Sequence, residues 1–138
     1  MGKLYILSFS LFALFTVSFL PPQQDSKKAD IYGYWVREDD GLQMELSHTE
    51  DNYDIGFSEI AVEGNKGFPC NLKKEIIYKN IVQEHDSVWT CDFLVITVND
   101  CTYNYKTGGK MSLTKMGKLL VVCPGFQPMY YDKKNPRH

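Results

Sequence analysis

The sequence lacks the short motifs that most readily reveal catalytic and metal sites. It contains no Gly-x-Ser-x-Gly, no His-Glu-x-x-His and no phosphate-cradling glycine loop. It also contains no Cys-x-x-Cys pair, which argues against the common zinc sites and against a redox dithiol of that type. These absences favour a protein that is not an enzyme and that uses no metal or cofactor.

The histidines and acidic runs supply no alternative chemistry. His48 and Glu45 fall on opposite faces of the strand predicted to contain them, so they do not form an acid-base pair. His85 beside Asp86 is typical of a solvated turn. The run 38–40 lacks the alternating ligand spacing of a calcium loop and is interpreted as a turn.

Neither sign of charge is in excess. The chain has 15 Lys and Arg against 17 Asp and Glu, which gives a formal net charge of -2. The charges are interspersed, so nothing favours a nucleic-acid partner. The only basic cluster, in residues 133–138, lies in a Pro- and Asn-containing end and is predicted to be a disordered tail.

Long apolar runs are absent except at the start. Residues 1–20 carry one lysine and then an apolar stretch, which predicts a secretory signal peptide, cleaved near Ser18 and followed by a linker over 21–30. The alternative is a retained anchor, although the run 4–20 is slightly short for a spanning helix. The sequence therefore predicts an exported protein, periplasmic or extracellular, that touches a membrane only through this segment if it stays uncleaved.

Residues 31–132 are predicted to form a single all-β domain. Beta-branched and aromatic residues are abundant there, and turn dipeptides such as Asp40-Gly41 and Gly108-Gly109 recur at short intervals. The strands are expected at 31–38, 42–49, 53–62, 75–84, 88–98, 102–106, 111–114 and 119–123.

These strands are joined mostly by hairpins, which predicts an antiparallel up-and-down meander. A meander of about eight strands removes its exposed edges most simply by closing into a small barrel. Residues 73–83 form the one ambiguous segment, because their apolar positions fit the spacing of a short helix as well as that of a strand.

The first hairpin determines whether Trp35 lies inside the barrel. A two-residue loop at 39–40 or 40–41 places Trp35 opposite Met44 or Leu46, whereas a three-residue loop leaves it in solvent. Exposing an indole forfeits about 2 to 3 kcal/mol of burial, which favours the first arrangement. The alternation of Leu42, Met44 and Leu46 with polar residues indicates one dry face.

Gly33-Tyr34-Trp35, followed by a meander of this length, resembles the Gly-x-Trp opening of lipocalin-like (calycin) barrels. It also resembles small exported bacterial barrels of that shape. The resemblance implies that Trp35 packs across a closed end and that the open end admits a small apolar ligand. The basic residue that covers the tryptophan in that family has Lys118 as its nearest candidate, with Arg137 farther along.

Four cysteines in a chain predicted to be exported suggest two disulfides. The expected turns bring Cys70 and Cys101 to one end of the sheet and place Cys91 and Cys123 at a common level. We therefore predict the pairs Cys70–Cys101 and Cys91–Cys123, provided that the α-carbons of each pair come within about 7 Å.

Two functional classes are compatible with these features. The first is an exported, non-catalytic protein that holds a small apolar or amphipathic ligand inside the barrel, between Trp35, Met44, Leu46, Phe57, Trp89 and Phe93. The second is a protein-binding inhibitor or immunity-type module that acts through its loops. A filled interior would favour the second class, because an eight-stranded barrel is only just wide enough for its own side chains.

Overall fold

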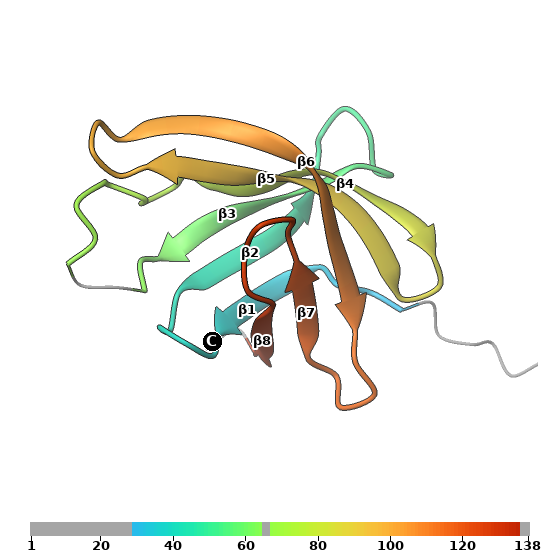
Figure 1. Ribbon diagram of the computed structural model, residues 1–138. Coiled ribbons are helices and arrows are strands. Elements are labelled where there is room, and N and C mark those ends of the chain that lie inside the picture. Colours follow the sequence, from blue (N-terminus) through green and yellow to red (C-terminus); the bar gives the residue numbers. More distant parts are fainter. Residues whose placement is uncertain (1–28, 65–66, 136–138) are drawn as a thin grey trace, which may run out of the picture.

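The computed structural model describes residues 29–64 and 67–135, and the predicted signal segment 1–20 lies outside them. Eight antiparallel strands follow one another in chain order and close into a barrel (Figure 1). This confirms the predicted all-β meander. The strands are β1 (Gly33–Arg37), β2 (Gln43–His48), β3 (Gly56–Val62), β4 (Ile76–His85), β5 (Val88–Thr97), β6 (Thr102–Leu113), β7 (Leu119–Val122) and β8 (Met129–Lys134). Within the described ranges, no helix is long and apolar enough to cross a membrane.

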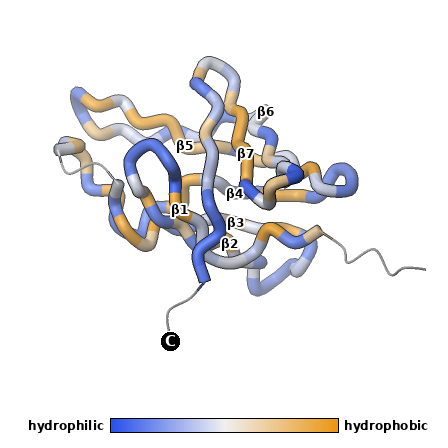
Figure 2. The backbone as a smooth tube through the Cα atoms, turned by 90° about the horizontal axis from the view of Figure 1, so that it is seen from below, coloured by the Kyte–Doolittle hydropathy of each residue, from blue (hydrophilic) through white to orange (hydrophobic). Residues whose placement is uncertain are grey.

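Alternate side chains of each strand point into the barrel and form its core. On β2, Met44 and Leu46 are buried while Gln43, Glu45 and Ser47 face outward. Figure 2 shows apolar stretches in β5 and β7 and largely hydrophilic turns between strands. The inward row also includes Ile31, Trp35, Leu42, Ile60, Tyr78, Ile81, Trp89, Cys91, Phe93, Met111, Leu119, Val121, Cys123 and Tyr131.

The barrel is closed by a strand that the sequence pattern did not predict. β8 pairs with β1 over four residue pairs, from Tyr34 with Lys134 to Arg37 with Tyr131. Lys133 and Lys134, which were expected in a disordered tail, therefore belong to this strand, whereas 136–138 lie outside the described residues. The pairing removes the free edge that β1 would otherwise expose.

A second difference concerns β6. The expected turn at Gly108-Gly109 does not form, and the two short strands predicted there are one strand of 12 residues. Gly108 has φ +91°, which marks a bend, and a Cβ on Gly109 would lie 2.7 Å from Cys91 Sγ. Gly108 thus permits a bend within the strand, and Gly109 permits the close approach of Cys91.

The first turn has one of the two expected registers but a longer loop. Trp35 pairs with Met44, as a two-residue loop at 39–40 requires. The strands end earlier, however, and Gly41 takes φ +76° while its N–H donates to the carbonyl of Arg37 at 3.0 Å. The loop therefore spans residues 38–42 without changing which face of β1 is buried.

The ambiguous segment 73–83 contributes to strand β4 and forms no helix. A bulge interrupts its pairing with β5 between Lys79 and Val82, where Asn80 has φ 50°. As a result Tyr78 and Ile81, three residues apart, are both buried. A bulge thus explains why the apolar spacing of this strand looked helical.

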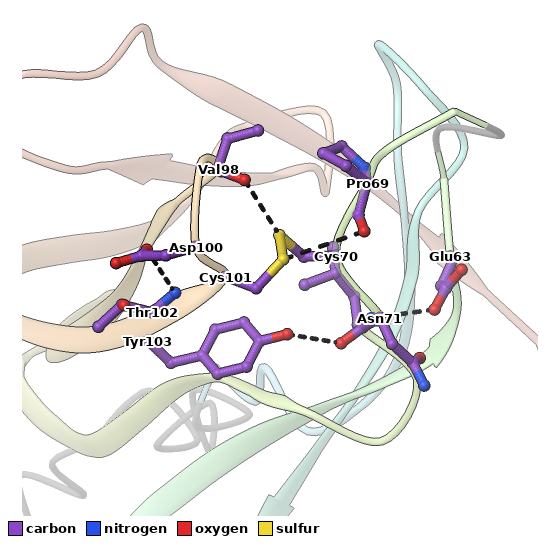
Figure 3. The surroundings of a disulfide bond; sticks show 10 residues. Glu63, Pro69, Cys70, Asn71, Val98, Asp100, Cys101, Thr102 and Tyr103 are labelled. Carbon is purple, nitrogen blue, oxygen red and sulfur yellow. Dashed lines mark hydrogen bonds between the residues drawn. A yellow bond between two sulfur atoms is a disulfide. The ribbon is translucent and has the colours of Figure 1, made fainter.

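The predicted disulfide between Cys70 and Cys101 is present, with α-carbons 5.5 Å apart. It joins the β3–β4 connection to the β5–β6 turn (Figure 3). Nearby, the Tyr103 hydroxyl donates to the Asn71 carbonyl at 2.8 Å. The long β5–β6 hairpin is therefore tied back to the β3–β4 connection at one end of the barrel.

The predicted bond between Cys91 and Cys123 is wrong, because both thiols are free and buried. Cys91 pairs with Gly109 on β6, and continuing the β6–β7 register places Gly109 opposite Cys123. One strand, β6, thus separates the two cysteines, and two strand spacings put their α-carbons about 9.6 Å apart. That separation exceeds the reach of a disulfide.

We predict that the folded protein carries one disulfide and two thiols that react only after unfolding. Burial of Cys91 and Cys123 blocks reagents in the native state. Thiol labelling before and after denaturation, followed by non-reducing peptide mapping, should give no labelled thiol and then two. A mapped Cys91–Cys123 bond would contradict the structure.

The close approach at Gly109 gives a second prediction. Gly109→Ala should lower the free energy of unfolding by about 1 to 3 kcal/mol, because the added methyl group overpacks against Cys91. In a Cys91→Ala background the same change should cost less, although the Cys91 carbonyl remains 3.0 Å from the new Cβ. Urea unfolding measures both effects, and equal costs in the two backgrounds would argue against this packing.

Candidate ligand pocket

One pocket opens at the barrel end that carries the disulfide. Its volume is about 280 Å³. Its walls come from the end of β1, the β1–β2 turn, the β3–β4 connection, β4, the second half of β5 and the β7–β8 segment. The lining residues are Arg37, Asp40, Leu42, Glu63, Gly64, Phe68, Leu72, Ile77, Tyr78, Phe93, Leu94, Val95, Ile96, Val98, Cys123, Phe126 and Met129.

Only one of the six predicted ligand-binding residues, Phe93, lines this pocket. Trp35, Met44, Leu46 and Trp89 are buried in the core, deeper in the barrel or toward its other end. Phe57 pairs with Ser47 on β2, and both residues alternate with buried neighbours, so Phe57 lies on the outer face.

Trp35 is held at a fixed depth in the barrel by polar contacts. Its ring is 1% exposed, and its indole N–H donates to the Ile31 carbonyl at 2.7 Å. Lys133 Nζ lies 5.4 Å from the ring centroid, within the range of a cation–π contact. Lys118, the candidate from the sequence, instead pairs with Glu38 and with Asp132.

A charged pair lies on the pocket wall. Arg37 donates through Nε and Nη2 to the two carboxylate oxygens of Asp40, at 2.8 and 2.6 Å. The Arg37 side chain is only 19% exposed. The hydrogen bonds from Arg37 lower the pKa of Asp40, and the same contact raises the pKa of Arg37. The pair therefore stays ionised.

Two tyrosine hydroxyls meet behind this pair. Tyr78 from β4 and Tyr131 from β8 are fully buried, and their hydroxyl oxygens lie 3.0 Å apart. Burial raises the pKa of both phenols, so both stay protonated at neutral pH. Tyr78 OH also lies 3.8 Å from the thioether sulfur of Met129.

The thiol on the pocket wall is not an activated nucleophile. Burial raises the pKa of Cys123 to about 11 and that of Cys91 to about 12, so neither forms a thiolate near neutral pH. Within 29–64 and 67–135, no three His, Cys, Asp or Glu side chains are grouped so that they could hold a metal ion.

A second hollow lies at the opposite end of the barrel, beside the β4–β5 turn. His48 stacks between Tyr32 and Tyr53 there, with ring centroids 3.5 and 3.7 Å away. His48 Nδ1 is buried without a hydrogen-bond partner. This hollow is more polar than the first, with Asp30, Asp54, Glu84 and Asp86 around it.

The sequence analysis did not identify the polar residues of the first pocket. Arg37 lies within the predicted strand 31–38 on the same face as Trp35, and this alternation was the available signal for its inward position. Tyr131 lies beyond the last predicted strand at 119–123, so its pairing with Arg37 could not be predicted. The bulge in β4 breaks the strand's alternation next to Tyr78, so the sequence pattern did not predict that Tyr78 is buried.

The comparisons with known proteins add no family to this picture: no protein-family model, curated protein or solved structure matches the chain. The class that the structure defines is therefore an eight-stranded antiparallel barrel with a pocket at one end, a shape compatible with lipocalin-like folds.

The ionised pair predicts a specific loss of stability in acid. Because the folded-state pKa of Asp40 is lowered from 3.8, Asp40 stabilises the fold above that pH. This contribution is lost as the pH falls through the lowered value. Urea midpoints measured from about pH 7 to about pH 2 should fall less steeply for Asp40→Asn than for the wild type. Parallel curves would contradict a role for this ion pair.

Proposed function

We propose that this protein is an exported, non-catalytic binding protein that holds a small apolar or amphipathic molecule in the pocket at the disulfide end of the barrel. The pocket itself carries the proposal. A barrel of eight strands can be filled by its own side chains, yet about 280 Å³ remains open here. That volume approaches the range of small-molecule sites and is about twice that of a cavity that takes up benzene.

The walls support an apolar ligand. Phe68, Leu72, Phe93, Val95 and other carbon-rich side chains form most of the surface. The buried core residues lie beneath them. The resemblance of Gly33-Tyr34-Trp35 to the lipocalin-like opening supports the same function, and the contact between Lys133 and Trp35 adds to that resemblance. The Cys70–Cys101 disulfide is consistent with export.

The alternative is a protein-binding module that acts through its loops. One observation favours it: Phe126 in the β7–β8 loop is 52% exposed although it borders the pocket. Its ring makes an edge contact with Phe93 at 5.9 Å between centroids. An exposed aromatic side chain on a loop is typical of an interface anchor.

Filling the pocket tests the proposal. Val95 lines the pocket, and Val95→Trp should weaken binding of a neutral solvatochromic naphthalene dye at least about tenfold by occupying the site. Val62→Trp is the matched control, because Val62 is 47% exposed and lies outside the pocket lining. Fluorescence titration measures both.

Equal dye binding by Val95→Trp and the wild type, or no binding by either, would count against the pocket as the functional site. A stoichiometric protein partner that is lost in Phe126→Ser but retained in Val95→Trp would favour the protein-binding alternative.

A further inference from the structure

Two strong hydrogen-bond donors on the pocket wall point at one weak acceptor. Arg37 Nη1 lies 3.7 Å from Met129 Sδ, and Tyr78 OH lies 3.8 Å from the same atom. All three residues line the pocket. A thioether sulfur accepts hydrogen bonds poorly compared with oxygen. The sulfur therefore occupies the position where an oxygen acceptor would be bound best.

Both donors are paired with the sulfur, and one of the two arrangements of the tyrosine hydroxyl protons leaves Tyr78 no better partner. Asp40 accepts one proton from Nε and one from Nη2 of Arg37, and the hydrogen bond of Nη1 goes to Met129 Sδ. Tyr78 and Tyr131 bring two hydroxyl protons but share a single hydrogen bond. When Tyr131 donates to Tyr78, the proton of Tyr78 has only Met129 Sδ as its acceptor. A buried donor with a poor acceptor is a source of binding energy for any ligand that supplies a good one.

We propose that this point is a subsite for a neutral oxygen acceptor, such as a carbonyl, on an otherwise apolar ligand. The ligand oxygen accepts from Arg37 Nη1 and Tyr78 OH, and the flexible Met129 side chain gives way to it. The inference rests on the proposed function, because it requires that the pocket hold a ligand, and it adds the chemical class of that ligand.

The charges around the subsite select a neutral group over a carboxylate. Asp40 already neutralises Arg37 with two hydrogen bonds. Glu63 is the third charged residue of the lining, and its carboxylate accepts from the Leu72 N–H at 3.0 Å. A ligand carboxylate would place a third negative charge beside one positive charge in a partly desolvated site, which is costly. A carbonyl oxygen uses the same two donors without that cost.

The experiment compares octane, 2-octanone and octanoate as competitors of the naphthalene dye at neutral pH, using the full folded protein. The ketone should bind about fivefold more tightly than octane, which is the effect of one added hydrogen bond. Octanoate should bind more weakly than the ketone. Asp40→Asn should reverse the order of ketone and octanoate, because Arg37 is then uncompensated.

Three variants locate the effect. Tyr78→Phe should remove most of the ketone preference and leave octane binding unchanged. Met129→Leu should increase the preference, because the two donors lose their internal acceptor. Tyr105→Phe is the matched control: its hydroxyl donates to the Ile76 carbonyl outside the pocket lining, so the preference should not change.

The outcomes separate the subsite from the pocket. Equal binding of octane and 2-octanone, or tightest binding of octanoate by the wild type, would overturn the subsite while the pocket proposal stands. Failure of all three to displace bound dye, together with dye binding that survives Val95→Trp, would overturn both proposals.

Discussion

The pairing of β8 with β1 is the constraint on which the rest of the structure depends. It closes the barrel, and its register places Arg37 beside Tyr131 and Lys133 beside Trp35. Without this pairing the sheet would have two free edges, and Arg37 would have no buried phenol next to it. The closed wall shields the core from solvent, and hydrogen bonds such as the one between Tyr78 and Tyr131 are electrostatically stronger there than in water.

Closure also divides the barrel into a filled part and an open part. Trp35, Met44, Leu46 and Trp89 are buried in the filled part. The long β5–β6 hairpin extends beyond the neighbouring strands β2 and β3 (Figure 1). The disulfide fixes that hairpin to the β3–β4 connection, and Val98 and Leu72 near it line the pocket. A covalent tie at the rim thus fixes two of the pocket's walls relative to each other.

Much of the architecture follows from side-chain alternation. The alternation in β2 and the size of Trp35 were sufficient to predict the burial of the indole, whereas two registers of the first hairpin stayed open and the structure has the one that pairs Trp35 with Met44. Glycine proved ambiguous, because Gly108-Gly109 provides a bend and a close approach within β6 and not a turn. That error, together with the missed β8, left the predicted number of strands unchanged. The prediction of a Cys91–Cys123 bond was wrong because β6 lies between the two cysteines.

The candidate site was harder to predict, because its polar residues come together only through closure. Arg37, Tyr78 and Met129 are distant in sequence and lie on three strands. The most direct test of the account is an isotope-filtered nuclear Overhauser measurement with 2-octanone bound to the labelled protein. The account predicts contacts from the ligand chain to Phe93 and Val95, and from the methyl group beside the carbonyl to Tyr78 and Met129. Contacts confined to Tyr32, Tyr53 and Trp89 at the opposite end would contradict it.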